Sequence, residues 1–358
     1  MPFLYIWRLD ISKLKKIIQY ILLFCSVVAF SQTDQDSIKS SKALSEVVIS
    51  ANRWKQNSKD IPQKVSIISP SKVALHNPQT AADLLTISGK VFMQKSQQGG
   101  GSPMIRGFAT NRLFYAIDGI RMNTAIFRGG NIQNVISLDP FAIEQTEVLF
   151  GPGSVMYGSD AIGGVMSFQT ITPQFSSDDK TIVNGTAVMR FSSANNEKTG
   201  HFDVSTGWKK WASVISISSN DFGDLKMGSH GPDEYIRPFY VQRQNGTDVV
   251  VTNSDPLVQK PTSYSQINLM QKVRFRPNEK WDFQYGFHFS ETSTYSRYDR
   301  HIRYNNRGLP RYGEWNYGPQ KWIMNNLNIT HESKSMLFDE MSFRLAHQFF
   351  EESRISRD

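Results

Sequence analysis

The residue types that could do chemistry are sparse in this chain of 358 residues. Gly151 and Gly153 open a glycine-rich run, but the next glycine is Gly158, so the spacing of a dinucleotide-binding loop is absent. No Gly-Lys-Ser/Thr follows to cradle a phosphate. Ser154 is preceded by Gly153 and followed by Val155, so the G-x-S-x-G nucleophile elbow also fails. The run therefore fits none of these three enzyme motifs.

The histidines and the single cysteine add no catalytic cluster. No two histidines reach the HxH or HxxxH spacing of a metal site. The seven positions are His76, His201, His230, His288, His301, His331 and His347. Cys25 lies in an N-terminal apolar run, so we expect neither a disulfide nor a reactive thiol in the mature chain. With no base, nucleophile or metal cluster, we predict that the protein is not an enzyme and has no intrinsic cofactor or metal.

The N-terminal segment has the features of an export signal. An apolar run at residues 17–30 follows three lysines, is too short to span a bilayer, and ends in Ala29-Phe30-Ser31, a typical processing site. We therefore predict a cleaved signal peptide at residues 1–31. The formal net charge of +8 is spread along the chain without a block of five like charges, so we expect no nucleic-acid partner.

The glycine-rich run is better explained as a folded knot between two strands. Residues 148–150 form an apolar run that enters Gly-Pro-Gly, and residues 164–168 form a second apolar run that leaves through Gly-Gly. Glycine allows positive φ and close backbone approach where a side chain would clash. The chain is therefore expected to turn sharply at this point and to be buried there.

The same run resembles the end of the plug domain of TonB-dependent outer-membrane receptors. The family pattern is roughly E-V-x-x-G-P-x-S-x-x-Y-G-x-x-A-x-G-G-V, and residues 147–165 match it at every specified position. Upstream, residues 105–108 (I-R-G-F) and 118–123 (D-G-I-R-M-N) resemble two further plug elements in the family's order. The resemblance implies an α+β plug domain at residues 54–172.

Within this region, apolar runs and one helical pattern alternate. Strand-like runs occur at residues 65–68, 113–117 and 146–150. Asn77-Pro78 before an apolar-periodic segment predicts a helix over residues 79–87, with the proline at the first helical position.

A polar leader precedes the plug and contains a short run of β-formers. Residues 32–53 begin with a Ser-, Asp- and Lys-rich stretch that cannot bury a core, so we expect a flexible leader. The β-formers are either the first strand of the next domain or a strand that pairs with a partner's sheet edge. They resemble the family's TonB box, which implies that TonB of the inner-membrane energy-transducing complex binds there. The box residues are Glu46, Val47, Val48, Ile49 and Ser50.

The resemblance also assigns roles to several plug residues. In the family, the arginine equivalent to Arg106 and the glutamate equivalent to Glu147 contact charges on the barrel wall, whereas two surface charges are the alternative. The apex loops at residues 109–111 and 120–131 are implied to meet the ligand. The candidate ligand-binding residues of the plug are Asn111, Arg112, Asn123, Phe127 and Arg128.

After residue 180 the pattern becomes strict alternation of apolar and polar residues. Seven strands are predicted, at residues 181–191, 200–208, 211–221, 263–275, 281–292, 321–332 and 340–350. Short and long connections alternate between them, which is typical of a transmembrane β-barrel. The family's barrel has twenty-two strands, so residues 180–358 are predicted to be the N-terminal portion of an antiparallel barrel in the outer membrane. We expect the chain to be a truncated reading frame or a fragment.

The connection at residues 293–320 has the composition of a binding surface. Arginine and aromatic side chains are enriched at recognition sites, although an aromatic belt at the membrane interface is an alternative. The candidate ligand-binding residues here are Arg297, Tyr298, Arg300, His301 and Trp315.

The sequence R-Y-D-R in this loop, and E-W-x-Y-G-P-Q after it, resemble the subgroup that takes up haem or haemoglobin iron. The implied function is TonB-dependent uptake of an iron complex, with haem as the transported ligand. In that subgroup the usual haem ligands are a histidine or tyrosine in the plug apex and a histidine in a later barrel loop. Residues 99–130 contain no histidine and the later loop is expected beyond Asp358, which leaves His301 as the candidate haem ligand within this sequence. A ferric-siderophore or other nutrient receptor, and a ligand-binding or adhesion module without transport, remain as alternatives.

Overall fold

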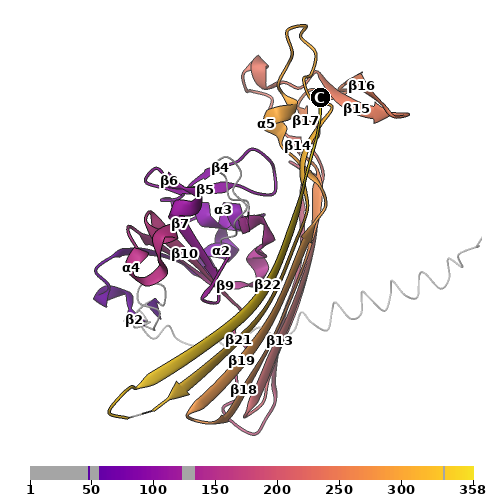
Figure 1. Ribbon diagram of the computed structural model, residues 1–358. Coiled ribbons are helices and arrows are strands. Elements are labelled where there is room, and N and C mark those ends of the chain that lie inside the picture. The colour runs from indigo at the N-terminus through magenta and orange to yellow at the C-terminus, as the bar shows by residue number, and fades with distance from the viewer. Residues whose placement is uncertain (1–46, 49–55, 123–133, 334) are drawn as a thin grey trace, which may run out of the picture. The chain divides into compact units, whose positions relative to one another are not determined.

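The computed structural model describes residues 47–48, 56–122, 134–333 and 335–358. All of them fall within one compact unit, Glu46–Asp358 (Figure 1). The predicted signal peptide and most of the predicted leader lie outside the described residues.

The N-terminal part of this unit is built on a five-stranded mixed sheet. Its strand order is β3-β9-β10-β7-β8, and β10 pairs parallel to β7 and antiparallel to β9. The strands are β3 (Lys64–Ile68), β7 (Leu113–Ile117), β8 (Ile120–Arg121), β9 (Ile143–Phe150) and β10 (Gly164–Thr170). The three strands predicted from apolar runs are therefore confirmed. β7 is buried at every position, as expected for an apolar run without alternation.

Two helices cover this sheet, and one of them corrects the predicted helix start. α3 spans Ala81–Thr86 and buries Ala81, Leu84 and Leu85, but it begins after Thr80, whose hydroxyl accepts a hydrogen bond from the Asp83 backbone N–H (3.3 Å). The predicted start at Asn77-Pro78 was wrong because a separate helix, α2 (Pro70–His76), ends there with Asn77 in the left-handed conformation (φ 44°). Both asparagine and a following proline are as compatible with the end of one helix as with the start of another.

The glycine-rich run forms the predicted knot between β9 and β10. The knot contains α4 (Ser154–Tyr157) and the short helix η6 (Ser159–Ala161). At Gly164 (φ 156°) a Cβ atom would lie 2.6 Å from the Leu149 carbonyl oxygen. At Gly163 a Cβ atom would collide with the Phe108 side chain. Close backbone approach therefore requires glycine at both positions.

Smaller sheets flank this core. β4 (Phe92–Gln94), β5 (Ser102–Ile105) and β6 (Phe108–Ala109) form one three-stranded sheet. β1 (Val47–Val48) pairs antiparallel with β2 (Gln56–Asn57), and Val48 is fully buried in an apolar cluster with Phe114, Leu149 and Val165. Part of the predicted TonB box is therefore a strand packed on the plug core.

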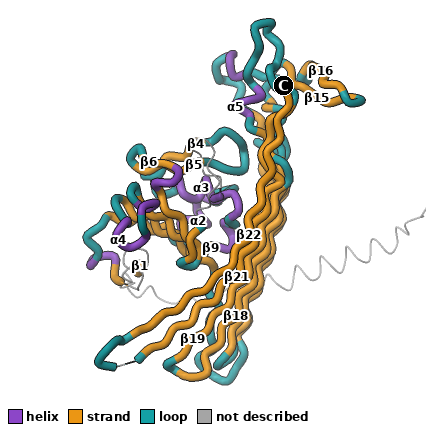
Figure 2. Tube along the Cα trace, viewed as in Figure 1, coloured by secondary structure: helices purple, strands orange, loops and turns teal. Residues whose placement is uncertain are grey.

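The C-terminal part is one long antiparallel sheet, whose strands run side by side in Figure 2. Each of the seven predicted strands has a counterpart. They are β11 (Ile182–Ser192), β12 (Glu197–Gly207), β13 (Trp211–Phe222), β18 (Tyr264–Asn278), β19 (Trp281–Thr292), β21 (Glu314–Glu332) and β22 (Glu340–Arg357). β21 begins earlier and β22 ends later than predicted, because the two pair from Glu314↔Arg357 to Glu332↔Glu340.

The two faces of this sheet differ in the sense that the alternation predicted. On β13 the inward positions include Ser216, Ser218 and Asn220, all buried, whereas Ile215 and Ile217 point outward and are exposed. On β12, Glu197 and His201 are buried while Phe202 is 52% exposed. A polar face turned to the plug and an apolar face turned outward are the pattern of a wall between protein and lipid. We call these long strands the wall.

The long connections of the wall carry their own structure at one end of the sheet (Figure 1). β14 (Leu225–Lys226) pairs with β17 (Val258–Gln259), and β15 (Phe239–Gln244) pairs with β16 (Thr247–Thr252). β20 (Tyr295–Ser296) and α5 (Tyr298–His301) follow β19. Among the helices of the described segments, none is both long and apolar enough to cross a membrane.

The knot provides a first testable prediction. In Gly164→Ala the new methyl group would press on the Leu149 carbonyl, so we expect the local opening free energy of β9 and β10 to fall by about 1–3 kcal/mol. Amide hydrogen exchange measures this loss directly. Gly200→Ala is the matched strand control, because a Cβ atom there meets nothing within 4 Å. Equal exchange rates in the two variants would contradict the proposed role of Gly164.

Candidate functional site

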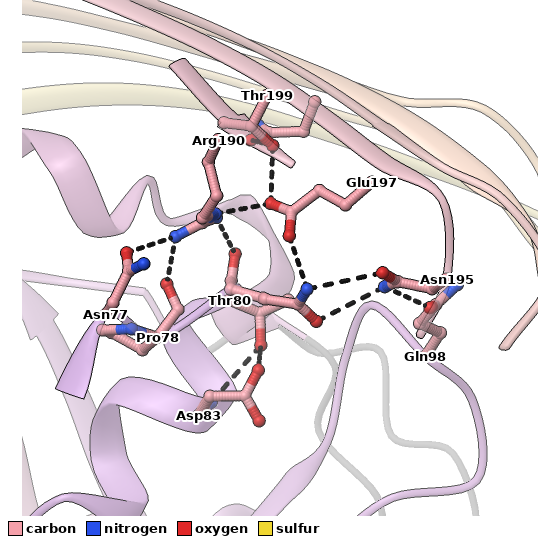
Figure 3. A network of polar contacts seen from close by, with 11 residues as sticks. Asn77, Pro78, Thr80, Asp83, Gln98, Arg190, Asn195, Glu197 and Thr199 are labelled. Atoms are coloured by element: carbon pink, nitrogen blue, oxygen red, sulfur yellow. Dashed lines mark hydrogen bonds and ion pairs between the residues drawn. The ribbon is translucent and has the colours of Figure 1, made fainter. Parts of the chain in front are cut away.

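The plug and the wall meet through buried polar contacts, and the most extensive set surrounds residues 77–79 (Figure 3). On the wall, Arg190 pairs with Glu197 (Nε to Oε1, 2.6 Å), and both side chains are almost fully buried. The same guanidinium donates to the Asn77 side-chain oxygen (3.0 Å) and to the Pro78 carbonyl (3.0 Å). We call this set, with Gln79, the clasp.

Local structure explains why the plug offers acceptors at this point. α2 ends at Asn77 and α3 begins after Thr80, so the backbone carbonyls between the helices have no helical partners. A guanidinium has five N–H donors in a planar fork and suits several acceptors at once. Arg190 therefore satisfies a helix-to-helix turn and the buried carboxylate of Glu197 together.

Three carboxamides extend the clasp towards the loop end of the wall. The Gln79 amide donates to Glu197, and the Asn195 amide donates to the Gln79 oxygen (3.3 Å) and the Gln98 oxygen (2.7 Å). Gln98 in turn donates to the Gly223 carbonyl (3.0 Å) and the Thr262 carbonyl (3.0 Å). Plug residues thus bind two wall turns through side chains that each act as donor and acceptor.

A second contact is a buried ion pair between the plug turn β7–β8 and strand β18. The Lys272 ammonium lies 2.9 Å from Asp118 Oδ2 and donates to the Thr170 carbonyl (3.1 Å), and the lysine side chain is 1% exposed. Burial alone would raise the pKa of Asp118. The Lys272 charge, the nearby His288 imidazole and a hydrogen bond from the Thr170 backbone N–H outweigh burial and hold this pKa well below its usual range. Asp118 is therefore ionised, and its carboxylate neutralises the buried ammonium of Lys272.

A third contact contains a serine, a histidine and two aspartates. Ser218 Oγ lies 2.6 Å from Asp139 Oδ2 of the plug and 2.7 Å from His201 Nδ1, and His201 Nε2 lies 3.0 Å from Asp203. The Phe141 ring stacks on His201, with 4.7 Å between ring centres. Ser218 is fully buried, so no substrate reaches it, and burial raises the pKa of Asp139. The arrangement holds plug to wall and is not a hydrolase site.

The two plug residues predicted to contact wall charges are placed differently. Glu147 is fully buried and accepts from Gln145 (2.8 Å) and Gln169 (3.0 Å) of the plug. Arg106 is exposed (φ 49°), and among the described residues it forms no ion pair. The described wall strands do not test contacts with other wall charges, so the predicted role of these two residues stays a prediction.

Sequence reasoning missed the residues that form these contacts between plug and wall. They are Arg190, Glu197, Lys272, Asp118 and Asp139. One signal was available, since Arg190 and Lys272 stand at inward positions of strands whose other face is apolar. A charge at such a position has to find a partner inside. The identity of the partner depends on how the plug docks, which alternation does not encode.

The predicted ligand-binding residues divide into three groups. Asn111 and Arg112 are exposed in the turn before β7, next to the knot. Asn123, Phe127 and Arg128 lie outside the described residues. The loop residues come together: the Arg297 guanidinium lies over the Trp315 ring at 5.1 Å and pairs with Asp299 at 2.7 Å, and Arg300 lies over Trp315 at 5.5 Å. Tyr298 joins this loop to the plug, because its backbone N–H donates to the Ser96 carbonyl (3.0 Å).

His301, the predicted haem-ligand candidate, is buried in the same loop. The residue is 4% exposed, and its Nε2 atom has no hydrogen-bond partner among the described residues. Burial and the nearby Arg237 charge lower the pKa of His301, so the imidazole is neutral at pH 7. A neutral imidazole is the form that binds metals, but this one is not accessible in the present arrangement.

Comparison with known sequences identifies the plug. The family described as "TonB-dependent Receptor Plug Domain" matches residues 57–165, within the predicted range. Over 130 residues the chain is 35% identical to the vitamin B12 transporter BtuB of Vibrio vulnificus (strain YJ016), covering 35% of this chain and 20% of the transporter. Over 161 residues it is 27% identical to the hemin receptor of Yersinia pestis, covering 45% of this chain and 23% of the receptor. The aligned part of the chain thus spans about a fifth of the curated relatives it matches.

Solved structures extend the likeness to the wall. The FrpB iron transporter from Neisseria meningitidis superposes with a TM-score of 0.61 at 14% identity, over 81% of this chain and 41% of that one. The copper transporter OprC gives a TM-score of 0.59 at 15% identity, over 80% of this chain and 37% of that one. At these identities the likeness shows the fold, and the relatives named in these comparisons are described as transporters and receptors. Residues 57–165 therefore carry a plug domain of the TonB-dependent receptor family, and the antiparallel strands that follow share the fold of the solved transporters.

Proposed function

We propose that this chain belongs to an exported outer-membrane receptor that takes up a metal complex with energy transmitted by TonB, and that the complex is haem. The observation that carries the proposal is the short strand β1 at the predicted TonB box. It is paired with β2 over only two residue pairs, Val47↔Asn57 and Val48↔Gln56, beside a plug that many contacts hold to the wall.

The small size of the β1–β2 pairing suits a strand that changes partners. Each backbone hydrogen bond contributes about 1 kcal/mol net, so two residue pairs are readily exchanged for a partner's sheet edge that offers more. Because Val48 is buried in the plug core, capture of β1 by TonB would pull directly on the cluster of Phe114, Leu149 and Val165. Pulling would thereby reach the knot and β10.

Two lines support haem as the ligand. Hemin receptors of Yersinia pestis and Yersinia enterocolitica align with 27% and 26% identity. The loop at residues 293–320 also gathers Arg297, Arg300 and Trp315 into one partly buried cluster, a composition typical of recognition surfaces. Arginine offers paired donors for carboxylates, and tryptophan offers a flat ring for stacking.

Uptake should depend on the main-chain donors of β1. Val48→Pro removes a backbone N–H and fixes φ, so we expect energy-dependent haem uptake to be abolished in cells that express the receptor. Val48→Ala is the matched control, because it also empties the buried position, at a cost of about 2 kcal/mol, but keeps the N–H. Uptake in the alanine variant should persist. Uptake that survives in Val48→Pro, or that is lost equally in both variants, would count against the proposal.

Retention of the plug should depend on the Asp118–Lys272 pair. Asp118→Asn leaves a buried ammonium without its carboxylate, so we expect plug stability against urea to fall by about 3–5 kcal/mol at pH 7. The control is Asp160→Asn, which breaks a partly exposed pair with Arg121 worth about 0–1 kcal/mol.

The pH dependence of the same comparison follows from the lowered pKa of Asp118. Because the pKa of Asp118 is lower in the folded state, its ionised form stabilises that state at pH values above the unfolded-state pKa of about 3.9. This stabilisation is lost as the pH falls through the folded-state pKa. The difference between wild type and Asp118→Asn should stay constant from about pH 7 to pH 5 and shrink below about pH 4. A difference that shrinks already at pH 6 would assign the effect to another group.

A further inference from the structure

Arg237, in the long connection between β13 and β18, is a buried cation without a carboxylate partner among the described residues. It is 1% exposed, its Nε donates to the Lys260 carbonyl (3.1 Å), and its Nη1 donates to the Tyr304 hydroxyl (3.3 Å). The guanidinium also lies 5.9 Å from the Tyr298 ring centre. These dipoles and the ring hold the guanidinium in place, but they do not neutralise its positive charge.

The hydroxyl that receives this hydrogen bond belongs to a short hairpin at residues 303–311. The Arg311 N–H donates to the Arg303 carbonyl (2.8 Å), Tyr304 bridges to Pro310, and the Asn305 N–H donates to the Leu309 carbonyl (2.8 Å). This pairing places Arg303 and Arg311 opposite each other across the two strands. Like charges at opposed positions destabilise a hairpin unless something neutralises them.

No acidic side chain in the described part of the chain neutralises the hairpin. Asp299 pairs with Arg297 and Arg300, and Glu314 pairs with Arg357 at 2.6 Å. Neither Arg303, Arg307 nor Arg311 forms an ion pair with a described residue. The hairpin and Arg237 therefore create a concentrated positive potential at the loop end of the wall.

A cavity of about 410 Å³ opens on this hairpin, lined by Tyr304, Asn305, Asn306, Arg307 and Arg311. Because Arg237 donates to the Tyr304 oxygen, the hydroxyl proton of Tyr304 remains to be donated elsewhere. The Asn305 oxygen already accepts from the Arg307 and Leu309 N–H groups, so its amide nitrogen is left as a donor. Most of the polar groups that remain at the cavity are thus donors, two of them on cations.

We propose that this cavity binds a small soluble oligo-anion, a molecule with two or more carboxylate or phosphate groups. The inference rests on the proposed function in one respect, since it defines the cargo class of that receptor as an anionic complex. Haem, which carries two carboxylates, belongs to this class. Arg307 and Arg311 bind the anion directly, Tyr304 donates to it, and Arg237 is a positioning residue that acts through Tyr304.

The test is calorimetric titration of the purified full chain in neutral detergent, free of lipid, with citrate and with inorganic pyrophosphate. Wild type should bind both saturably, and the affinity should fall as the salt concentration rises. Arg311→Gln should weaken binding about tenfold, the worth of one charge-assisted hydrogen bond, and Tyr304→Phe several-fold. The Arg311 side chain is exposed and is not an acceptor or ion-pair partner of a described buried group, so Arg311→Gln is the primary variant. Tyr304→Phe also removes an acceptor from the buried Arg237, so its thermal unfolding is compared with that of wild type before its affinity is interpreted.

The matched control is Arg243→Gln. Arg243 is half-exposed on β15 in the same set of loops and pairs with Asp248 at 3.6 Å, away from the hairpin cavity. The Arg243→Gln substitution removes one positive charge from the same region. An anion affinity within about twofold of wild type shows that the cavity residues, and not the regional charge, are responsible for binding.

Three results would overturn the proposal. They are no saturable binding of either anion, unchanged affinity in Arg311→Gln, and binding only to vesicles that contain lipopolysaccharide, whose phosphates are the other source of such groups. These outcomes are separable from failure of the proposed function. Anion binding that persists while haem uptake is absent refutes uptake alone, and uptake without anion binding refutes this site alone.

Discussion

The constraint on which the rest of the structure depends is that the inner face of the wall is polar and buried. Its outer face is apolar, so alternation along each strand sends the polar side chains towards the plug. A buried polar group without a partner costs free energy, and a buried charge costs more. The plug therefore has to supply acceptors and carboxylates at matching positions, and it does so with Asp118 for Lys272 and with residues 77–79 for Arg190.

Sequence reasoning recovered the features that local patterns specify. The knot was predictable because glycine at 163 and 164 follows from backbone approach, and the long strands were predictable because period-two alternation persists over ten or more residues. The clasp was not, because Arg190 contacts residues more than a hundred positions away in the chain. The predicted helix start failed for a related reason, since Asn77 and Pro78 serve the end of α2 and the clasp rather than the start of α3.

The contacts around the plug differ widely in strength, which bears on how a pulled plug would move. β1 is tied by two residue pairs and one buried valine, whereas the plug is tied to the wall by an ion pair, a carboxamide chain and the Asp139 contact. Force applied at β1 reaches weak contacts first. The clasp carboxamides come next in strength, because neutral hydrogen bonds are individually weaker than a buried charge pair. The Asp118–Lys272 pair is thus the contact best suited to keep part of the plug on the wall.

The loop end of the wall is connected to the plug by the same kind of bond that holds the clasp. Tyr298 donates to Ser96, and Gln98 donates to the carbonyls of Gly223 and Thr262. Ser96 and Gln98 are separated by one residue, so the α5 loop and the turns beside β14 and β17 both end on one short plug segment. An anion that relieved the repulsion between Arg303 and Arg311 would favour one arrangement of the α5 loop over others. The α5 loop is hydrogen-bonded to Ser96 through backbone atoms. A change in the loop would therefore also shift the plug segment that binds Asn195 of the clasp.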